Sequence, residues 1–174
     1  KAIEIDAIFD PNNYPLILNK GYETTPIADT TEYTYKESLD NIKRPTRLGY
    51  TFVSWSPEIP ATMPADTFRT TAQWEVNQYR YVVYTSETDS VETLVNYGET
   101  LEPLAEQSKE GYTFKGWDIE QPATMPANDL IIRAMWEIND YKFDLYDGET
   151  LLKTYVFNFN DSIKLNDYQD PTKE

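Results

Sequence analysis

The sequence of 174 residues contains neither cysteine nor histidine. These absences exclude a disulfide scaffold, a zinc site with Cys or His ligands, a cysteine nucleophile and a histidine general base. No glycine-rich phosphate loop and no nucleophile elbow occurs. No apolar run approaches the roughly 18 residues that a membrane span needs. We therefore expect no cofactor and no insertion into a membrane.

Basic side chains are few, with 15 Lys and Arg against 30 Asp and Glu, which gives a formal net charge of −15. This balance argues against nucleic-acid binding and against docking on an anionic membrane, because Lys and Arg supply most of both affinities. Aromatic residues make up 14% of the chain, which argues against disorder. The frequent Thr, Tyr, Val and Ile favour strands.

An internal repeat is the most informative feature of the sequence. Between residues 49–84 and 111–146, 18 of 36 positions are identical without a gap, at a constant spacing of 62 residues. The spacing extends at lower identity to Tyr35, Tyr97 and Phe159. The chain thus divides into a first unit at 1–78, a second at 79–140 and the opening half of a third at 141–174.

The first unit is longer than the second by about 13 residues between Phe9 and Tyr35, which predicts an enlarged hairpin around 12–25. At the other end of the chain, Asp170-Pro171-Thr172 is similar to the sequence that precedes Gly49-Tyr50. We expect the native polypeptide to continue with Gly-Tyr, and a stop codon at that point would refute this expectation.

The second unit predicts strands at 79–84, 91–97, 111–117 and 130–136, with a polar turn at 85–89. Two prolines make 122–127 a loop, and 101–109 is either an extended connection or a short helical turn. The fold class is therefore mostly β or α+β. The link at 137–140 contains neither Gly nor Pro, which predicts limited motion between units and an elongated, semi-rigid rod.

A unit of about 60 residues is marginal as an independent fold, so most of its aromatic residues are needed inside. This requirement favours the tryptophans as core anchors rather than exposed platforms. The predicted structural anchors of the repeat are Gly49, Tyr50, Phe52, Trp55, Met63 and Trp74 in the first unit, and Gly111, Tyr112, Phe114, Trp117, Met125 and Trp136 in the second.

Three segments of the second unit resemble a known family. Gly111–Trp117, Met125–Asp129 and Ala134–Trp136 are similar to the Listeria–Bacteroides repeat, the B-repeat type of internalin-like surface proteins. The first unit departs from the pattern at Val53-Ser54. Both units are shorter than usual between the tryptophan and Met-Pro-Ala, where the family often has a hairpin and a helical turn.

The resemblance implies small β-grasp (ubiquitin-like) modules in tandem, with little helix, on a large secreted protein of Gram-positive or gut bacteria. Such repeats usually sit between a functional head and a cell-wall anchor. The implied location is extracellular, at the cell surface or in the cell wall.

Candidate chemistry is sparse. Asp118 and Glu120 are a pair of carboxylates of the kind that glycosidases use, but the matching positions are Ser56 and Glu58, and we expect no enzyme. The carboxylate oxygens of an acidic cluster in the third unit are weak calcium candidates. The members of this cluster are Asp140, Asp144, Asp147 and Glu149.

Two function classes remain, and fibre formation through exposed strand edges is a third alternative. The first class is a non-catalytic spacer or stalk in adhesion, whose partners are neighbouring repeats of the same chain. The second is a module that binds a host protein or a polysaccharide through the Tyr-rich insertion of the first unit. The candidate ligand-binding residues are Tyr14, Tyr22, Tyr33 and Tyr35.

Overall fold

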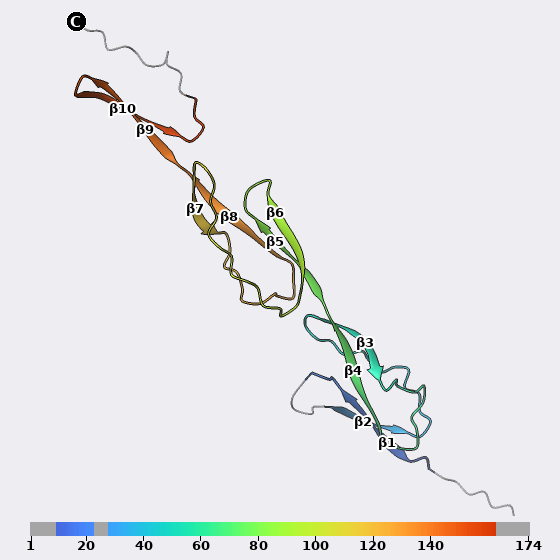
Figure 1. Ribbon diagram of the computed structural model, residues 1–174. Coiled ribbons are helices and arrows are strands. Elements are labelled where there is room, and N and C mark those ends of the chain that lie inside the picture. Colours follow the sequence, from blue (N-terminus) through green and yellow to red (C-terminus); the bar gives the residue numbers. More distant parts are fainter. Residues whose placement is uncertain (1–9, 23–27, 163–174) are drawn as a thin grey trace, which may run out of the picture. The chain divides into compact units, whose positions relative to one another are not determined.

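The computed structural model describes residues 10–22 and 28–162, and every regular element in these ranges is a strand (Figure 1). The first repeat holds β1 (Asn13–Asn19), β2 (Asp29–Thr34), β3 (Tyr50–Ser56) and β4 (Phe68–Val76). The second holds β5 (Gln78–Tyr84), β6 (Ser90–Asn96), β7 (Tyr112–Trp117) and β8 (Leu130–Ile138). A last hairpin is formed by β9 (Asp140–Asp147) and β10 (Thr150–Asn158).

Each repeat builds one four-stranded mixed sheet. In the first, the order is β2-β1-β4-β3, with β1 parallel to β4 and both outer pairs antiparallel. In the second, the order is β6-β5-β8-β7, again with a parallel central pair. This order is that of the β-grasp sheet. The predicted mostly-β class with little helix is confirmed, because the regular elements of the described residues are strands and none is a helix.

Strand β4 shows why these sequences form a half-buried sheet. Thr70 and Ala72 are buried while Arg69 and Gln73 are exposed, which is the period of two that a pleated strand imposes. The register between β3 and β4 shifts between Phe52 and Ser54, and it shifts again at the matching place between β7 and β8. A shift of this kind marks a β-bulge, which increases the local twist of the sheet.

The core lies between each sheet and two extended connections, which cover it in place of a helix. In the first repeat, Leu16 and Leu39 pack together with Met63, which is 1% exposed. The connections hydrogen-bond to each other, since Leu39 N–H donates to Ala61 O at 3.0 Å. In the second repeat, Leu101 N–H donates to Ala123 O at the same distance, and Met125 is again 1% exposed.

Strand β1 lies within the enlarged hairpin predicted at 12–25, and the extent of this hairpin stays a prediction. Residues 13–19 form β1, which pairs with β2, and part of the segment between these two strands lies outside the described residues. The predicted continuation after 174 also lies outside the described residues.

The described residues fall into two compact units. One comprises the chain up to Tyr79 together with Val95–Glu99, and the other comprises Arg80–Leu94 together with the chain from Thr100. The end of β6 therefore belongs to the first compact unit although its sequence belongs to the second repeat. The predicted boundaries at 78/79 and 140/141 and the predicted rod stay predictions.

Candidate functional site

A cluster of aromatic rings spans β3 and β4 of the first repeat. Phe52 meets Trp55 and Trp74 edge to face, with ring centroids 5.5 and 5.7 Å apart. The indole N–H of Trp74 donates to the carbonyl oxygen of Lys20 at 2.7 Å. This half-buried tryptophan thus ties the loop of the first hairpin to β4, with its one polar group satisfied.

The second repeat contains the same cluster. Phe114 lies 5.4 Å from Trp117 and 5.4 Å from Trp136. The indole N–H of Trp136 donates to Thr85 O at 2.9 Å, in the loop between β5 and β6. Both repeats therefore use these rings and indole groups to join strands and hairpin loops.

Tyr22 covers the tryptophan cluster of the first repeat. Its ring packs edge to face on Trp74, with a centroid distance of 5.8 Å. The guanidinium of Arg47 lies 4.8 Å from the Tyr22 ring and 3.5 Å from the Tyr50 ring. The loop reaches β4 because Gly21 has φ +77°, and a Cβ there would lie 2.7 Å from Ala72 O.

The corresponding surface of the second repeat is a groove. The loop at 85–89 carries no aromatic residue that could cover Trp136. Lys109 Nζ lies 3.9 Å from the Tyr112 ring and 5.8 Å from the Trp136 ring. Three rings and three charged side chains line the groove: Tyr84, Glu87, Lys109, Tyr112, Arg133 and Trp136.

The four candidate tyrosines do not form one site. Tyr14 and Tyr33 are opposite each other in the β1–β2 register and pack against the Leu16 core. Tyr22 belongs to the loop at the other end of this hairpin. Tyr35 is 41% exposed, just beyond β2. Ligand binding by these residues stays a prediction.

Two of the acidic candidates, Asp144 and Asp118, have structural partners. Asp144 accepts a hydrogen bond from Thr154 Oγ1 at 2.5 Å across the β9–β10 hairpin. In the part of the chain that the structure describes, no three acidic residues lie in a group that could hold a metal ion. Asp118 accepts the backbone N–H of Arg133 at 2.7 Å, and the Arg133 guanidinium lies 3.8 Å from its other oxygen.

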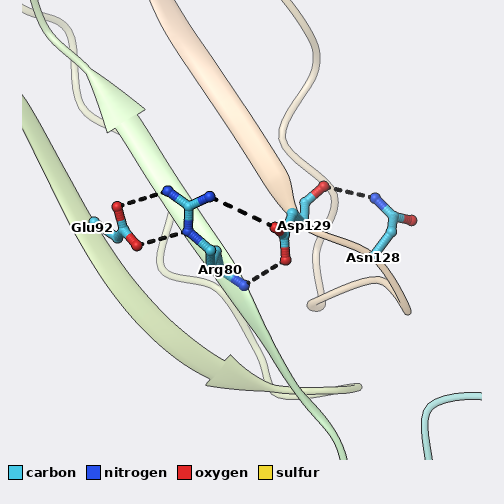
Figure 2. Close-up of polar contacts among 4 residues, drawn as sticks. All are labelled: Arg80, Glu92, Asn128 and Asp129. Carbon is cyan, nitrogen blue, oxygen red and sulfur yellow. Dashed lines mark hydrogen bonds and ion pairs between the residues drawn. The ribbon is translucent and has the colours of Figure 1, made fainter.

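Arg80 on β5 makes a bidentate ion pair with Glu92 and also contacts Asp129 (Figure 2). Its Nε and second terminal nitrogen donate to the two oxygens of Glu92, at 2.7 and 2.9 Å. Its backbone N–H donates to Asp129 Oδ1 at 2.9 Å. The hydrogen bond from Arg80 lowers the pKa of Glu92, and the same bond raises the pKa of Arg80.

Sequence reasoning missed the groove and its charged residues. The available signal was divergence between otherwise similar repeats: Arg133 and Asp118 stand where the first repeat has Thr71 and Ser56. Lys109 matches Arg47, so the basic residue beside the Gly-Tyr segment is shared. What differs is the loop that covers the tryptophan, and its conformation is not readable from residue types alone.

Comparison with known proteins gives a family and two relatives. The Listeria–Bacteroides repeat domain matches residues 17–73 and 81–131. The chain is 31% identical to a protein of Evansella cellulosilytica that bears the name of a Gly-rich membrane protein, over 78% of this chain and 17% of the relative. A second protein of that organism, named as a membrane protein, is 27% identical over 67% of this chain and 20% of its own length.

The chain spans about a fifth or less of the length of these relatives, and no solved structure matches it. Among the described residues, no helix has the length and apolarity to cross a membrane. Domains of this family occur in surface proteins and are generally non-catalytic. The matched regions cover more than half of the sequence and contain the Gly-Tyr-Thr-Phe-x-x-Trp and Met-Pro-Ala segments of both repeats. The chain therefore belongs to the Listeria–Bacteroides repeat family.

Proposed function

We propose that this segment is a non-catalytic spacer in a surface-associated protein and that it holds a functional region away from the cell. The observation that carries the proposal is the repetition of the tryptophan cluster, in which Trp74 and Trp136 each bind a hairpin-loop carbonyl. Residues used in the same way in both repeats serve the fold of each module, as a spacer requires.

The surface charge supports this proposal. A net charge of −15 on 174 residues keeps a chain of this kind soluble and repels similar chains. Relatives named as membrane proteins are several times longer than this chain, which fits a segment that serves other regions of a larger protein. The proposal includes a location at the cell surface and a role in adhesion.

The test measures length. Small-angle X-ray scattering would compare the 174-residue chain with a chain that carries a second copy of residues 78–139 directly after residue 139. A spacer predicts that the maximum dimension grows by the length of one module while the cross-section stays constant. An unchanged maximum dimension with a thicker cross-section would overturn the proposal, because the added module would then have folded back on its neighbours.

A second candidate function rests on the Trp136 groove. Aromatic rings together with Lys109, Arg133 and Glu87 supply stacking surfaces and hydrogen-bonding groups, which suit a polar ligand such as an acidic saccharide. The groove favours the second repeat over the Tyr-rich loop of the first, where Tyr22 occupies the matching surface.

Binding at the groove is tested by calorimetric titration with cell-wall and host polysaccharides. Arg133→Thr installs the residue of the first repeat and is expected to abolish a saturable response. The matched control is Arg69→Thr, on an exposed position of β4 outside the groove, which is expected to leave it intact. If the polysaccharides give no saturable heat with the unmodified chain, this second function is refuted for them.

A further inference from the structure

One backbone connection joins the first repeat to the end of the second hairpin, inside the first compact unit. Asn77 N–H donates to Gly49 O at 2.9 Å, and Tyr97 N–H donates to Asn77 O at 2.9 Å. Thr51 Oγ1 donates to Asn77 Oδ1 at 2.6 Å. The Tyr97 ring lies edge to face on Tyr50, with centroids 5.9 Å apart.

The same connection recurs inside the second compact unit. Asn139 N–H donates to Gly111 O at 2.8 Å, and Phe159 N–H donates to Asn139 O at 2.9 Å. Thr113 Oγ1 donates to Asn139 Oδ1 at 2.6 Å. The Phe159 ring lies edge to face on Tyr112, with centroids 6.0 Å apart. A Gly-Tyr-Thr segment of one repeat thus receives an aromatic ring from the next repeat in both places.

The glycine of each segment is required by this contact. Gly49 and Gly111 are buried and have φ +75°. A Cβ at Gly49 would overlap the Tyr97 ring, and a Cβ at Gly111 would overlap the Phe159 ring. Glycine therefore allows both the left-handed backbone and the close approach of the ring.

The first hairpin presents the same terminal turn. Tyr35 N–H donates to Asn12 O at 2.9 Å, as Tyr97 does to Asn77 and Phe159 to Asn139. The residue after each ring has a positive φ: 68° at Lys36, 76° at Gly98 and 64° at Asn160. An acidic side chain then accepts the backbone N–H of the last strand residue. In the first hairpin, the Thr34 N–H donates to the Glu37 carboxylate at 2.8 Å.

Tyr35 differs from its two counterparts in exposure. Its side chain is 41% exposed, whereas Tyr97 and Phe159 are half-buried against a Gly-Tyr pair. The ammonium of Lys36, an exposed residue, lies 5.2 Å from the Tyr35 ring. The first hairpin therefore has the same turn that brings Tyr97 and Phe159 onto a Gly-Tyr pair, but its own ring is exposed.

We propose that Tyr35 is the docking ring for the Gly-Tyr-Thr segment of a preceding repeat in the same polypeptide. This inference rests on the proposed spacer function. The contact between the Gly-Tyr-Thr segment of one repeat and the aromatic ring of the next, here called the joint, is the connection that such a spacer needs. The partner surface is a glycine with positive φ, followed by a tyrosine ring and a threonine hydroxyl, as at Gly49 and at Gly111.

The sequence before Asn12 supports this partner. Ala7, Phe9 and Asn12 match Ala72, Trp74 and Asn77 in residue type and spacing. The pattern Ala-x-aromatic-acidic-x-Asn ends a repeat at Asn77 and at Asn139, so it marks Asn12 as the last residue of a repeat. The first complete repeat would accordingly begin at Asn13, and a Gly-Tyr-Thr segment would belong to the repeat that ends at Asn12.

The test uses a fused chain in which residues 1–139 are followed directly by residues 13–174. In this chain Asn139 takes the place of Asn12, and Gly111-Tyr112-Thr113 of the first copy faces Tyr35 of the second. The first copy carries Tyr35→Phe so that only one Tyr35 reports. The readout is the rate of nitration of Tyr35 by tetranitromethane, followed by peptide mass spectrometry, against the 174-residue chain.

Docking predicts nitration of Tyr35 several-fold slower in the fused chain, with Tyr146, which is 55% exposed, reacting equally in both chains. Equal nitration rates at Tyr35 in the two chains would overturn the proposal. Equal rates are also the result expected if the Tyr35 ring binds a saccharide instead of a preceding repeat.

As a second measurement, Tyr35→Ala in the second copy is expected to lower the melting temperature of the fused chain more than the same change does in the 174-residue chain. Tyr35→Phe is expected to restore the melting temperature. The nitration rate does not depend on the length of the molecule. A negative nitration result can therefore be told apart from a negative X-ray scattering result, which would refute the spacer proposal.

Discussion

Gly49 and Tyr97 are in direct contact, although one precedes β3 and the other follows β6. Because glycine has no Cβ, the ring can approach its backbone closely. Asn77 connects the two residues, since its N–H donates to Gly49 O and its carbonyl oxygen accepts the N–H of Tyr97. Because Tyr97 belongs to the following repeat, the first repeat completes its surface with a residue that its own sequence does not supply. Repeat proteins gain stability from such nearest-neighbour contacts.

Substituting Gly49 with alanine is expected to destabilise the chain by about 2–4 kcal/mol, since it adds the left-handed backbone penalty to the overlap with the Tyr97 ring. The measurement is urea unfolding followed by tryptophan fluorescence. Gly98→Ala is the matched control, because its φ is +76° and nothing lies within 4 Å of the added Cβ. We expect it to cost only about 1 kcal/mol. Equal costs for the two variants would show that the contact with Tyr97 contributes nothing.

The side-chain bond of the joint has a smaller expected effect. Asn139→Ala removes the acceptor of Thr113 Oγ1, and we expect the second compact unit to lose about 0.5–1.5 kcal/mol. Thr113→Val removes the same bond from the other side. A double-mutant cycle therefore measures the interaction itself, and strictly additive losses would show that the 2.6 Å contact carries no coupling energy.

The Arg80–Glu92 pair predicts a dependence of stability on pH. The pKa of Glu92 is lowered in the folded chain by its hydrogen bond with Arg80, relative to about 4.3 in the unfolded chain. The stabilisation is therefore fully present above the unfolded pKa and is lost as the pH falls through the folded pKa. Because both side chains are about half exposed (51% and 51%), we expect a small effect that salt weakens.

Glu92→Gln tests this dependence. The melting temperatures of the variant and the unmodified chain are expected to differ at pH 7 and to converge in acid. Glu99→Gln is a control of the same charge change, since the Glu99 carboxylate accepts the backbone N–H of Asn96 in its own turn. A difference that grows on acidification would contradict the direction of the pKa change.

Removing the Tyr22 ring should expose Trp74. In Tyr22→Ala, we expect acrylamide to quench the tryptophan fluorescence more efficiently than in the unmodified chain, because the edge-to-face cover at 5.8 Å is lost. Tyr146→Ala, in the exposed part of the β9–β10 hairpin, is the control and is expected to leave quenching unchanged. If Tyr22→Ala behaves like the control, the loop does not protect the tryptophan cluster in solution.

The sequence predicted the four strands of the second repeat closely, with β5 at Gln78–Tyr84 against the expected 79–84 and β8 at Leu130–Ile138 against 130–136. These segments are rich in β-branched and aromatic residues and alternate in burial, so local pattern and tertiary structure agree. The first hairpin could not be placed in the same way, because the 62-residue spacing does not hold there: Leu16 of β1 pairs with Phe68, whereas Tyr81 of β5 pairs with Leu130.

The candidate site was predicted less well than the fold. Residue type marked Tyr14 and Tyr33 as binding candidates, yet they face the core, since strand register rather than composition decides which side of the sheet a ring occupies. The carbonyl partners of Trp74 and Trp136 lie in hairpin loops, and no local sequence pattern identifies them. The shared spacing of Tyr35, Tyr97 and Phe159 was readable, but the glycine that receives each ring required the structure.

Amide hydrogen exchange of the intact chain and of Tyr97→Ala tests the joint most directly. We expect faster exchange at Asn77, whose N–H donates to Gly49 O next to the removed ring, and at residue 97 itself. The second joint is the internal reference, because the N–H groups of Asn139 and Phe159 make the same bonds to Gly111 and Asn139 and should keep their rates. Unchanged exchange at Asn77 in the variant would contradict the claim that an aromatic ring of one repeat holds the end of the repeat before it.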